Sequence, residues 1–218
     1  RQMCIRDRLD EDLRWIKGLM QSWFEIKMRG VLGPGEGEVR QITLLGRLIT
    51  WTSEGIEYEA DPKHRQMVLD YFGLGEGSKE VVGVNGEKEE EDQPGDEVEL
   101  VGKEATEFRA IAARVNYLSL DCPDLQFPVK QCSREMAKPN QGSWRKLKKV
   151  ARYMLGVEAV KWVYKWQEEP TCCHVQSDSD WGGNVKDRKS TSGGVWMLGE
   201  HCIKTWSASQ GPFALSSA

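Results

Sequence analysis

The chain has 218 residues, of which 39% are hydrophobic and 29% charged, with a formal net charge of −4 at pH 7. This balance is typical of a folded globular protein, and no apolar run approaches the roughly 18 residues of a membrane-spanning helix. The charged N-terminus does not fit a secretory signal peptide, which argues against secretion. The acidic pI of about 5.6 also argues against a protein that binds nucleic acid over its whole surface.

The first part of the chain predicts a small sheet followed by a helix. Residues 1–8, RQMCIRDR, resemble a translated sequencing-adapter scar and are left out of the fold prediction. Within residues 9–75, the segment EVRQITLLGRLITWTSEGIEYEA predicts two strands with a turn at 52–55. Pro62 is expected at the first position of a helix that ends at Gly73. Residues 76–103 are acidic and rich in turn-forming residues, which predicts a flexible linker.

Residues 104–168 predict three helices and a strand. The second helix begins at Pro123, and Pro128 inside it predicts a kink or a late start. The third is capped by Ser143, carries basic side chains on one side and ends at Gly156. The next segment, VKWVYKW, alternates as a strand whose aromatic face is expected to pack between two subdomains. The first helix is indicated by apolar residues at helical spacing, namely Phe108, Ile111, Ala112, Val115 and Leu118.

The last segment, residues 171–218, predicts three short strands at about 173–177, 194–198 and 202–206, with a tight turn at 199–201. The six cysteines include no C-x-x-C pair, so reduced thiols are expected. A zinc site made from Cys172, Cys173, His174, His201 and Cys202 fits no standard ligand spacing. Thiols at core or edge positions are therefore predicted.

The stretch from His174 to His201 contains the residues with the clearest chemical potential. Asp178 and Asp180 lie two residues apart, so they point to the same side if they belong to one strand. Carboxylate oxygens are preferred ligands of Mg²⁺, and two such ions about 4 Å apart can assist phosphodiester cleavage. Such chemistry needs about four carboxylates, of which this stretch supplies one or two. The spacing alone leaves two readings open, an Asx-type turn or part of a metal site.

The wider motif favours one family. The segment SDSDWGGNVKDRKSTSGGVWMLG resembles the opening of the ribonuclease H domain of copia-type retrotransposon Pol polyproteins. Residues 108–156 resemble the end of the adjoining reverse transcriptase, and IKTWSASQGPFALSSA resembles the next stretch of the ribonuclease H domain. The resemblance covers residues 104–218 well and 32–72 loosely. The residues that match the first motif are Ser177, Asp178, Asp180, Trp181, Gly183 and residues 187–193.

This resemblance implies an α/β (α+β) fold. Residues 9–75 would belong to the reverse-transcriptase palm and hairpin region, 104–168 to thumb or connection helices and their strand, and 171–218 to the first antiparallel strands of a ribonuclease H-like sheet. The complete family protein copies RNA into DNA and hydrolyses the RNA strand of RNA–DNA hybrids with Mg²⁺. Asp178 is then the expected catalytic residue, with Asp178 and Asp180 as metal ligands. Because the family places further metal-binding acids beyond the position of Ala218, residues 1–218 alone are expected to be inactive.

The expected partners are a template–primer or RNA–DNA hybrid and the rest of the polyprotein, with no membrane, in a cytoplasmic virus-like particle or the nucleus. Solvated surfaces and turn caps are the alternatives for the basic and hydroxyl residues below. Two other hypotheses remain, a non-catalytic nucleic-acid-binding module and a decayed element, the latter suggested by the unusual Cys122 and Pro128. Gly194 also departs from the family, which often has Tyr there. The residues expected to contact the nucleic-acid backbone are Arg188, Lys189, Ser190, Thr191, Arg145, Lys146, Lys149 and Arg152.

Overall fold

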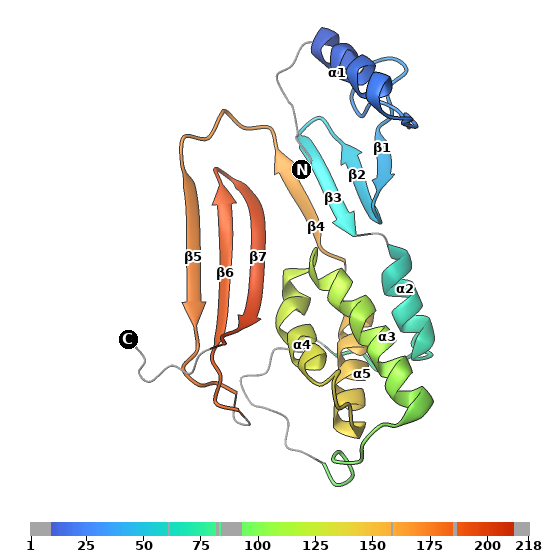
Figure 1. Ribbon diagram of the computed structural model, residues 1–218, viewed down its shortest axis with the longest axis vertical. Helices are drawn as coiled ribbons and strands as arrows, with labels where there is room; N and C mark the ends of the chain where they lie inside the picture. The colour runs from blue at the N-terminus through green and yellow to red at the C-terminus, as the bar shows by residue number, and fades with distance from the viewer. Residues whose placement is uncertain are drawn as a thin grey trace. The chain divides into compact units, whose positions relative to one another are not determined.

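A computed structural model describes residues 10–60, 62–81, 83, 93–157, 159–184 and 187–211. The chain divides into two compact units, Arg1–Val39 and Arg40–Ala218. The first contains helix α1 (Asp10–Trp23) and a parallel bridge between Leu32 and Val39 (Figure 1). The predicted scar at residues 1–8 lies outside the described residues, as do residues 212–218 and most of the acidic run at 84–92.

The second unit begins with a meander of β1 (Gln41–Leu44), β2 (Arg47–Trp51) and β3 (Gly55–Ala60), which β4 (Lys161–Lys165) completes from far along the sequence (Figure 1). The prediction of two strands before residue 61 was therefore wrong. Leu45 and Gly46 form a two-residue turn with φ angles of 51° and 71°, which splits the first predicted strand. Two-residue hairpin turns usually have Asn or Gly at the first position, so Leu45 did not indicate a turn in the sequence.

Helices α2 (Pro62–Tyr71), α3 (Gly102–Ser119), α4 (Pro123–Arg134) and α5 (Gln141–Gly156) enclose the hydrophobic core. All five apolar residues predicted for α3 are buried. Helix α4 begins at Pro123 and continues through Pro128, so it has no late start. Helix α5 is capped by Asn140, which accepts a hydrogen bond from the Ser143 N–H, while the Ser143 hydroxyl accepts one from the Asn140 N–H. Ser143, the predicted cap, is thus the second member of a capping box and lies three residues inside the observed cap, Asn140.

The end of the predicted linker is held against the helices. Leu100 is buried, and its N–H donates to the Pro139 carbonyl over 2.9 Å. Asp96 forms an ion pair with Arg145 of α5 and accepts a hydrogen bond from the Gln93 N–H. The last part of the predicted linker is therefore attached to the helical region, through partners about 40 to 50 residues further along the sequence.

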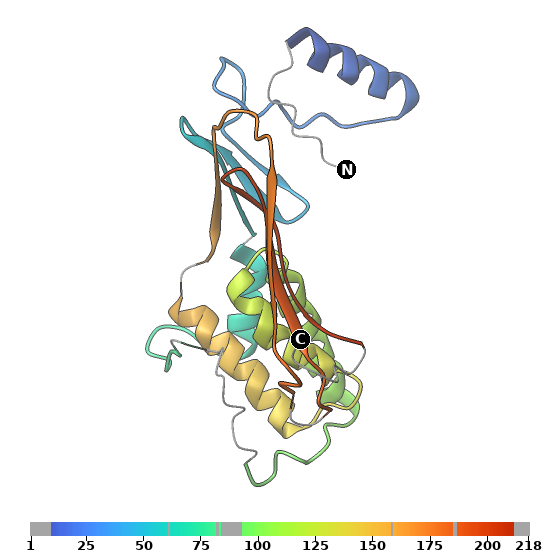
Figure 2. The same ribbon diagram turned by 90° about the vertical axis from the view of Figure 1, so that its left-hand side faces the viewer.

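A second antiparallel sheet has the order β5 (Cys173–Ser179), β6 (Thr191–Leu198) and β7 (His201–Ser209). All three strands were predicted, and each is longer than expected. Strand β7 passes alongside α4 and also meets β4 (Figures 1 and 2). The mixture of helices and antiparallel sheets confirms the predicted α/β (α+β) class. In the part of the chain that the structure describes, no helix has the length and apolar character needed to cross a membrane.

The aromatic strand β4 joins the helices to the second sheet, as predicted. The Trp162 indole N–H donates to the Asp121 carbonyl just after α3, over 2.7 Å. The Tyr164 hydroxyl donates to the carbonyl of Cys202 in β7 over 3.2 Å. Alternate residues of one short strand therefore bond to elements on both sides of the predicted subdomain boundary.

Candidate functional site at the acidic end of strand β5

Asp178 lies in the last part of β5, opposite Gly193 of β6. Its side chain is exposed, as is every residue of this edge strand. One carboxylate oxygen accepts a hydrogen bond from the Ser179 N–H over 2.8 Å. Strand pairing therefore fixes the backbone of Asp178 and leaves its carboxylate at the surface, where it can meet an ion or a substrate.

Asp180 stabilises the end of β5 through hydrogen bonds, which is one of the two roles that the sequence left open. Its Oδ1 accepts hydrogen bonds from the Thr191 N–H over 2.7 Å and from the Gly183 N–H over 3.3 Å. The Asp180 N–H in turn donates to the Thr191 carbonyl over 3.1 Å. A Cβ at position 183 would lie 2.5 Å from the second Asp180 oxygen, so a larger residue than Gly183 would have to displace this carboxylate. Asp180 thus ties the end of β5 to the start of β6 in an Asx-type turn, and its role as a metal ligand stays a prediction.

Of the predicted phosphate contacts on the following turn, the two hydroxyls are engaged within the protein. Ser190 is buried, and its hydroxyl accepts a hydrogen bond from the Gly182 N–H over 2.9 Å. The Thr191 hydroxyl accepts one from the Lys130 ammonium of α4 over 2.7 Å. The Ser190 contact fits the turn-capping alternative, whereas the Thr191 contact joins the strand to α4. Arg188 and Lys189 are left as the exposed and half-exposed cations of this turn.

Asp187 anchors the same turn to α4 through an ion pair with Arg134. Partial desolvation opposes ionisation of its carboxyl, but hydrogen bonds from Arg134 and from the Lys189 N–H hold the pKa of Asp187 below its ordinary value of 3.8. Arg188 has a left-handed backbone with φ of 53°, and its guanidinium lies next to Gly182. The turn is therefore held by side chains from both of its ends and from a helix.

The basic residues of α5 form a separate group. Arg145 is paired with Asp96, and Lys146 with Glu135 at 2.6 Å. Lys149 and Arg152 are half-buried on the same helix. The structure therefore brings Asp178, Asp180 and residues 187–191 together, whereas two of the four predicted α5 contacts already have acidic partners.

Comparison with known proteins gives the family. The chain is 35% identical over 103 residues to the Retrovirus-related Pol polyprotein from transposon RE2 of Arabidopsis thaliana, and 32% identical over 103 residues to that from transposon RE1. It is also 32% identical over 109 residues to Secreted RxLR effector protein 161 of Plasmopara viticola, which covers 50% of this chain and 75% of that protein. The chain is similar to retrovirus-related Pol polyproteins of transposons, and this similarity supports a retrotransposon Pol fragment. The resemblance drawn from the D-x-D-W and D-R-K-S-T-S-G motifs is thereby confirmed.

The matches to the two transposon Pol polyproteins span 47% of this chain and 7% of each relative. The chain therefore corresponds to a small part of those proteins, and what the whole polyproteins do is not carried over by identity alone. No protein-family profile and no solved structure matches the chain.

In this chain, the described residues alone do not make a magnesium site. No group of three or more His, Cys, Asp or Glu side chains in the described ranges is placed to hold a metal ion. Asp178 and Asp180 supply two carboxylates, and one oxygen of Asp180 already accepts two backbone hydrogen bonds. A two-metal site needs about twice as many carboxylates, so no metal-dependent step is derived from these residues.

Three residues of α4 that border the site were missed by the sequence analysis. Gln126, Lys130 and Arg134 all bond to the second sheet or to its 180–191 turn. Burial lowers the pKa of Lys130 to about 8, the charge of Asp180 opposes this shift, and Arg134 adds to it. The three residues are spaced four apart on a helix whose other side is apolar, and this pattern could have predicted a polar contact surface. It does not identify the second sheet as the element that they contact.

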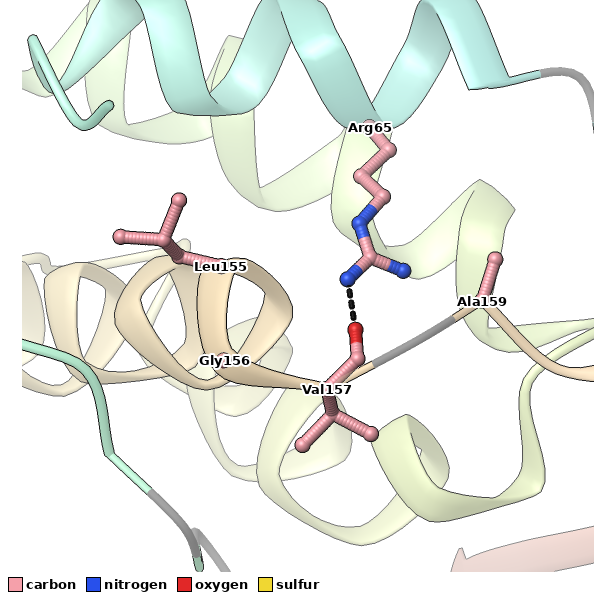
Figure 3. Close-up of a pocket in the computed structure, with 5 residues that line it drawn as sticks. All are labelled: Arg65, Leu155, Gly156, Val157 and Ala159. Carbon is pink, nitrogen blue, oxygen red and sulfur yellow. Dashed lines mark hydrogen bonds between the residues drawn. The ribbon is translucent and has the colours of Figure 1, made fainter. Parts of the chain in front are cut away.

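A hollow beside α5 is a weaker candidate. It has a volume of about 400 Å³ and is lined by Arg65, Leu155, Gly156, Val157 and Ala159 (Figure 3). The Arg65 guanidinium donates to the carbonyls of Met154 and Val157, so it caps the C-terminus of α5. With its one charged side chain used in this way and an otherwise apolar lining, the hollow lacks the convergent polar groups of a binding site.

Proposed function

We propose that this chain is the junction at which a copia-type reverse transcriptase leads into its ribonuclease H domain. In this assignment α2–α5 and β4 are thumb or connection elements, the β1–β3 meander belongs to the palm and hairpin region, and β5–β7 are the first strands of the ribonuclease H-like sheet. The complete polyprotein is then an RNA-directed DNA polymerase that also hydrolyses RNA in RNA–DNA hybrids. The observation that carries the proposal is the exposed Asp178 carboxylate near the end of β5, the first strand of the second sheet, within the family motif.

In this proposal each residue of the site has a distinct task. Asp178 is a metal ligand and the catalytic carboxylate of the complete domain. Asp180 keeps the end of β5 in place and adds negative charge beside it. Arg188 and Lys189 meet the phosphate backbone of the hybrid, with an affinity that falls as the salt concentration rises. Mg²⁺, when bound in the complete domain, stabilises negative charge on the oxygens of the cleaved phosphodiester.

The competing hypotheses find less support. A module that only binds nucleic acid would rely on the basic face of α5, but Arg145 and Lys146 are paired with Asp96 and Glu135. A decayed element would be expected to accumulate core defects. The two unusual residues are instead accommodated, since Cys122 is buried at the N-cap position of α4 and Pro128 is buried within the helix.

The test uses this chain extended at its C-terminus with the corresponding downstream segment of the RE2 polyprotein, which in this proposal carries the rest of the domain. We expect Mg²⁺-dependent cleavage of labelled RNA in a hybrid, and a loss of about 100-fold or more in Asp178→Asn. Glu200→Gln, an exposed acid on the β6–β7 turn, is the matched control and should keep the parent rate. Residues 1–218 alone should show no cleavage above background. Cleavage by Asp178→Asn at more than a tenth of the parent rate would overturn the proposal.

A further inference from the structure

Helix α4 carries a polar stripe, defined here as Gln126, Lys130 and Arg134, each four residues from the next. Gln126 donates through its amide to the Thr205 hydroxyl over 2.9 Å and to the Thr205 carbonyl over 3.3 Å. Lys130 donates to the Thr191 hydroxyl over 2.7 Å, and Arg134 pairs with Asp187. Residues at i, i+4 and i+8 share one side of a helix, so one side of α4 follows the second sheet from β7 to the turn after β5.

We infer that the α4 stripe is a docking surface that positions the acidic end of β5, with Lys130 and Arg134 as its positioning residues. The catalytic part of this inference rests on the proposed function, whereas the docking part does not. If it holds, the reverse-transcriptase part of the polyprotein sets the geometry of the ribonuclease H site.

The path from Lys130 to the acidic end of β5 is short. The Lys130 ammonium holds the side chain of Thr191, whose N–H donates to the Asp180 carboxylate and whose carbonyl accepts from the Asp180 N–H. Asp178 lies two residues before Asp180 in the sequence, and strand pairing places it opposite Gly193 of β6. A displacement of Thr191 is therefore transmitted to Asp180 through two hydrogen bonds and to Asp178 through the strand.

Arg134 fixes the other side of the same turn. Asp187 bonds to Arg134 with one carboxylate oxygen, and with the other it accepts the Lys189 N–H over 3.1 Å. The Asn184 carbonyl accepts the Arg188 N–H over 2.7 Å, which closes the turn on itself. An ion pair at this position therefore sets where Arg188 and Lys189 lie relative to Asp178.

The opposite end of the second sheet is also attached to the rest of the protein, through β4 and Gln167. A ring nitrogen of His201 lies 2.7 Å from the Lys165 carbonyl, and the His201 and Tyr164 rings are 5.3 Å apart. The Gln167 amide donates to the Leu198 carbonyl and accepts the Glu200 N–H. With both ends attached, the sheet cannot pivot on one contact, so loss of the α4 contacts should release the acidic end alone.

Amide hydrogen exchange on the 218-residue chain tests the docking. In Lys130→Met, we expect the amides of Asp180 and Thr191 to exchange about tenfold faster, because a hydrogen bond to a charged group is lost. The amides of α3 should be unchanged, which shows that the variant folds. Lys130→Arg should restore protection, and Lys148→Met, a lysine of α5 that is not part of the stripe, should leave it unchanged. Exchange within about twofold of the parent at both amides in Lys130→Met would overturn the inference.

The extended protein described above tests the catalytic consequence. Lys130→Met is expected to lower kcat for hybrid cleavage about tenfold with KM changed by less than about twofold, since a positioning residue affects the reacting geometry rather than binding. Lys130→Arg should recover most of the rate. If Asp178→Asn abolishes cleavage while Lys130→Met leaves kcat unchanged, the positioning inference fails and the proposed function stands. If Asp178→Asn cleaves normally, the proposed function fails, and the exchange experiment still decides the docking.

Discussion

Replacement of Asp121 with Asn should be among the most damaging single changes to this fold. The Asp121 side chain is 7% exposed, and its carboxylate lies 3.1 Å from Arg47 Nε and accepts the Tyr58 hydroxyl over 2.7 Å. These bonds join β2 and β3 of the meander to the end of α3. Asn can still accept from Tyr58, but it leaves the Arg47 guanidinium, itself 21% exposed, without its countercharge.

The size of the effect follows from that exposure. Removal of one partner from a fully buried ion pair costs about 3–5 kcal/mol, and partial hydration of Arg47 lowers the expected loss to about 2–3 kcal/mol. For a domain of this size the loss corresponds to a fall in Tm of about 5–10 °C. Thermal and urea unfolding followed by circular dichroism would measure it.

An exposed pair in the same sheet is the control. Lys161 and Glu57 lie 3.2 Å apart with side chains that are 47% and 30% exposed, so Lys161→Met should leave the free energy of unfolding close to that of the parent. A double-mutant cycle with Arg47→Met and Asp121→Asn should give a coupling energy above about 1 kcal/mol. A loss below about 1 kcal/mol in Asp121→Asn, or a coupling near zero, would refute the reasoning.

The pH dependence gives an independent measure of the same network. Burial, followed by the hydrogen bond to Asp121 and the charge of that residue, raises the pKa of Tyr58 above its ordinary value of 10.0. Because the folded-state pKa is the higher one, the contribution of Tyr58 to stability is complete below pH 10 and is lost as the pH rises towards the folded-state pKa. In Asp121→Asn the tyrosinate absorbance should appear at lower pH than in the parent.

Three further changes test other parts of the structure. Leu45→Asn should stabilise the protein by about 1 kcal/mol, because φ of 51° suits Asn better than Leu, and an unchanged urea midpoint would contradict this. Gly194→Ala should destabilise it by about 1–3 kcal/mol and alter the near-ultraviolet dichroism, since the new Cβ would lie 2.2 Å from the Trp206 indole. Burial raises the pKa of Cys132 to about 12, so at about pH 8 its thiol should react with a disulfide reagent only after unfolding, whereas the exposed Cys172 should react at once.

The sequence predicted best where the pattern was long and local. The stripe of α3 and the three strands of the second sheet follow from periodicity and turn residues, and both were confirmed. The Leu45–Gly46 turn was missed because its first residue lacks the usual turn chemistry. The cap of α5 was misplaced because Asn140 and Ser143 are both good capping residues and only the backbone distinguishes them.

For the site, the sequence located the acidic end of β5 but not what surrounds it. Asp187 and Arg134 are 53 residues apart, and Arg145 and Asp96 are 49 apart. No local pattern identifies such partners, so basic residues that pair within the protein looked the same as basic residues available to a ligand. The Asx turn at Asp180 was an open alternative for a related reason, since the shortest hydrogen bond to its carboxylate comes from Thr191, beyond the turn itself.

Because the β5–β7 sheet is attached to the rest of the protein at both of its ends, it should stay bound when the chain is cleaved between β4 and β5. The peptide between β4 and β5, at residues 166–172, contributes one of several connections between the sheet and the helices. A protease that cleaves within Glu168–Pro170 would therefore leave two fragments that remain associated, with α4 and Gln167 on one and β5–β7 on the other. Two such fragments produced separately should complement each other, and the proposed division between polymerase and nuclease parts would then fall within one cooperative folding unit.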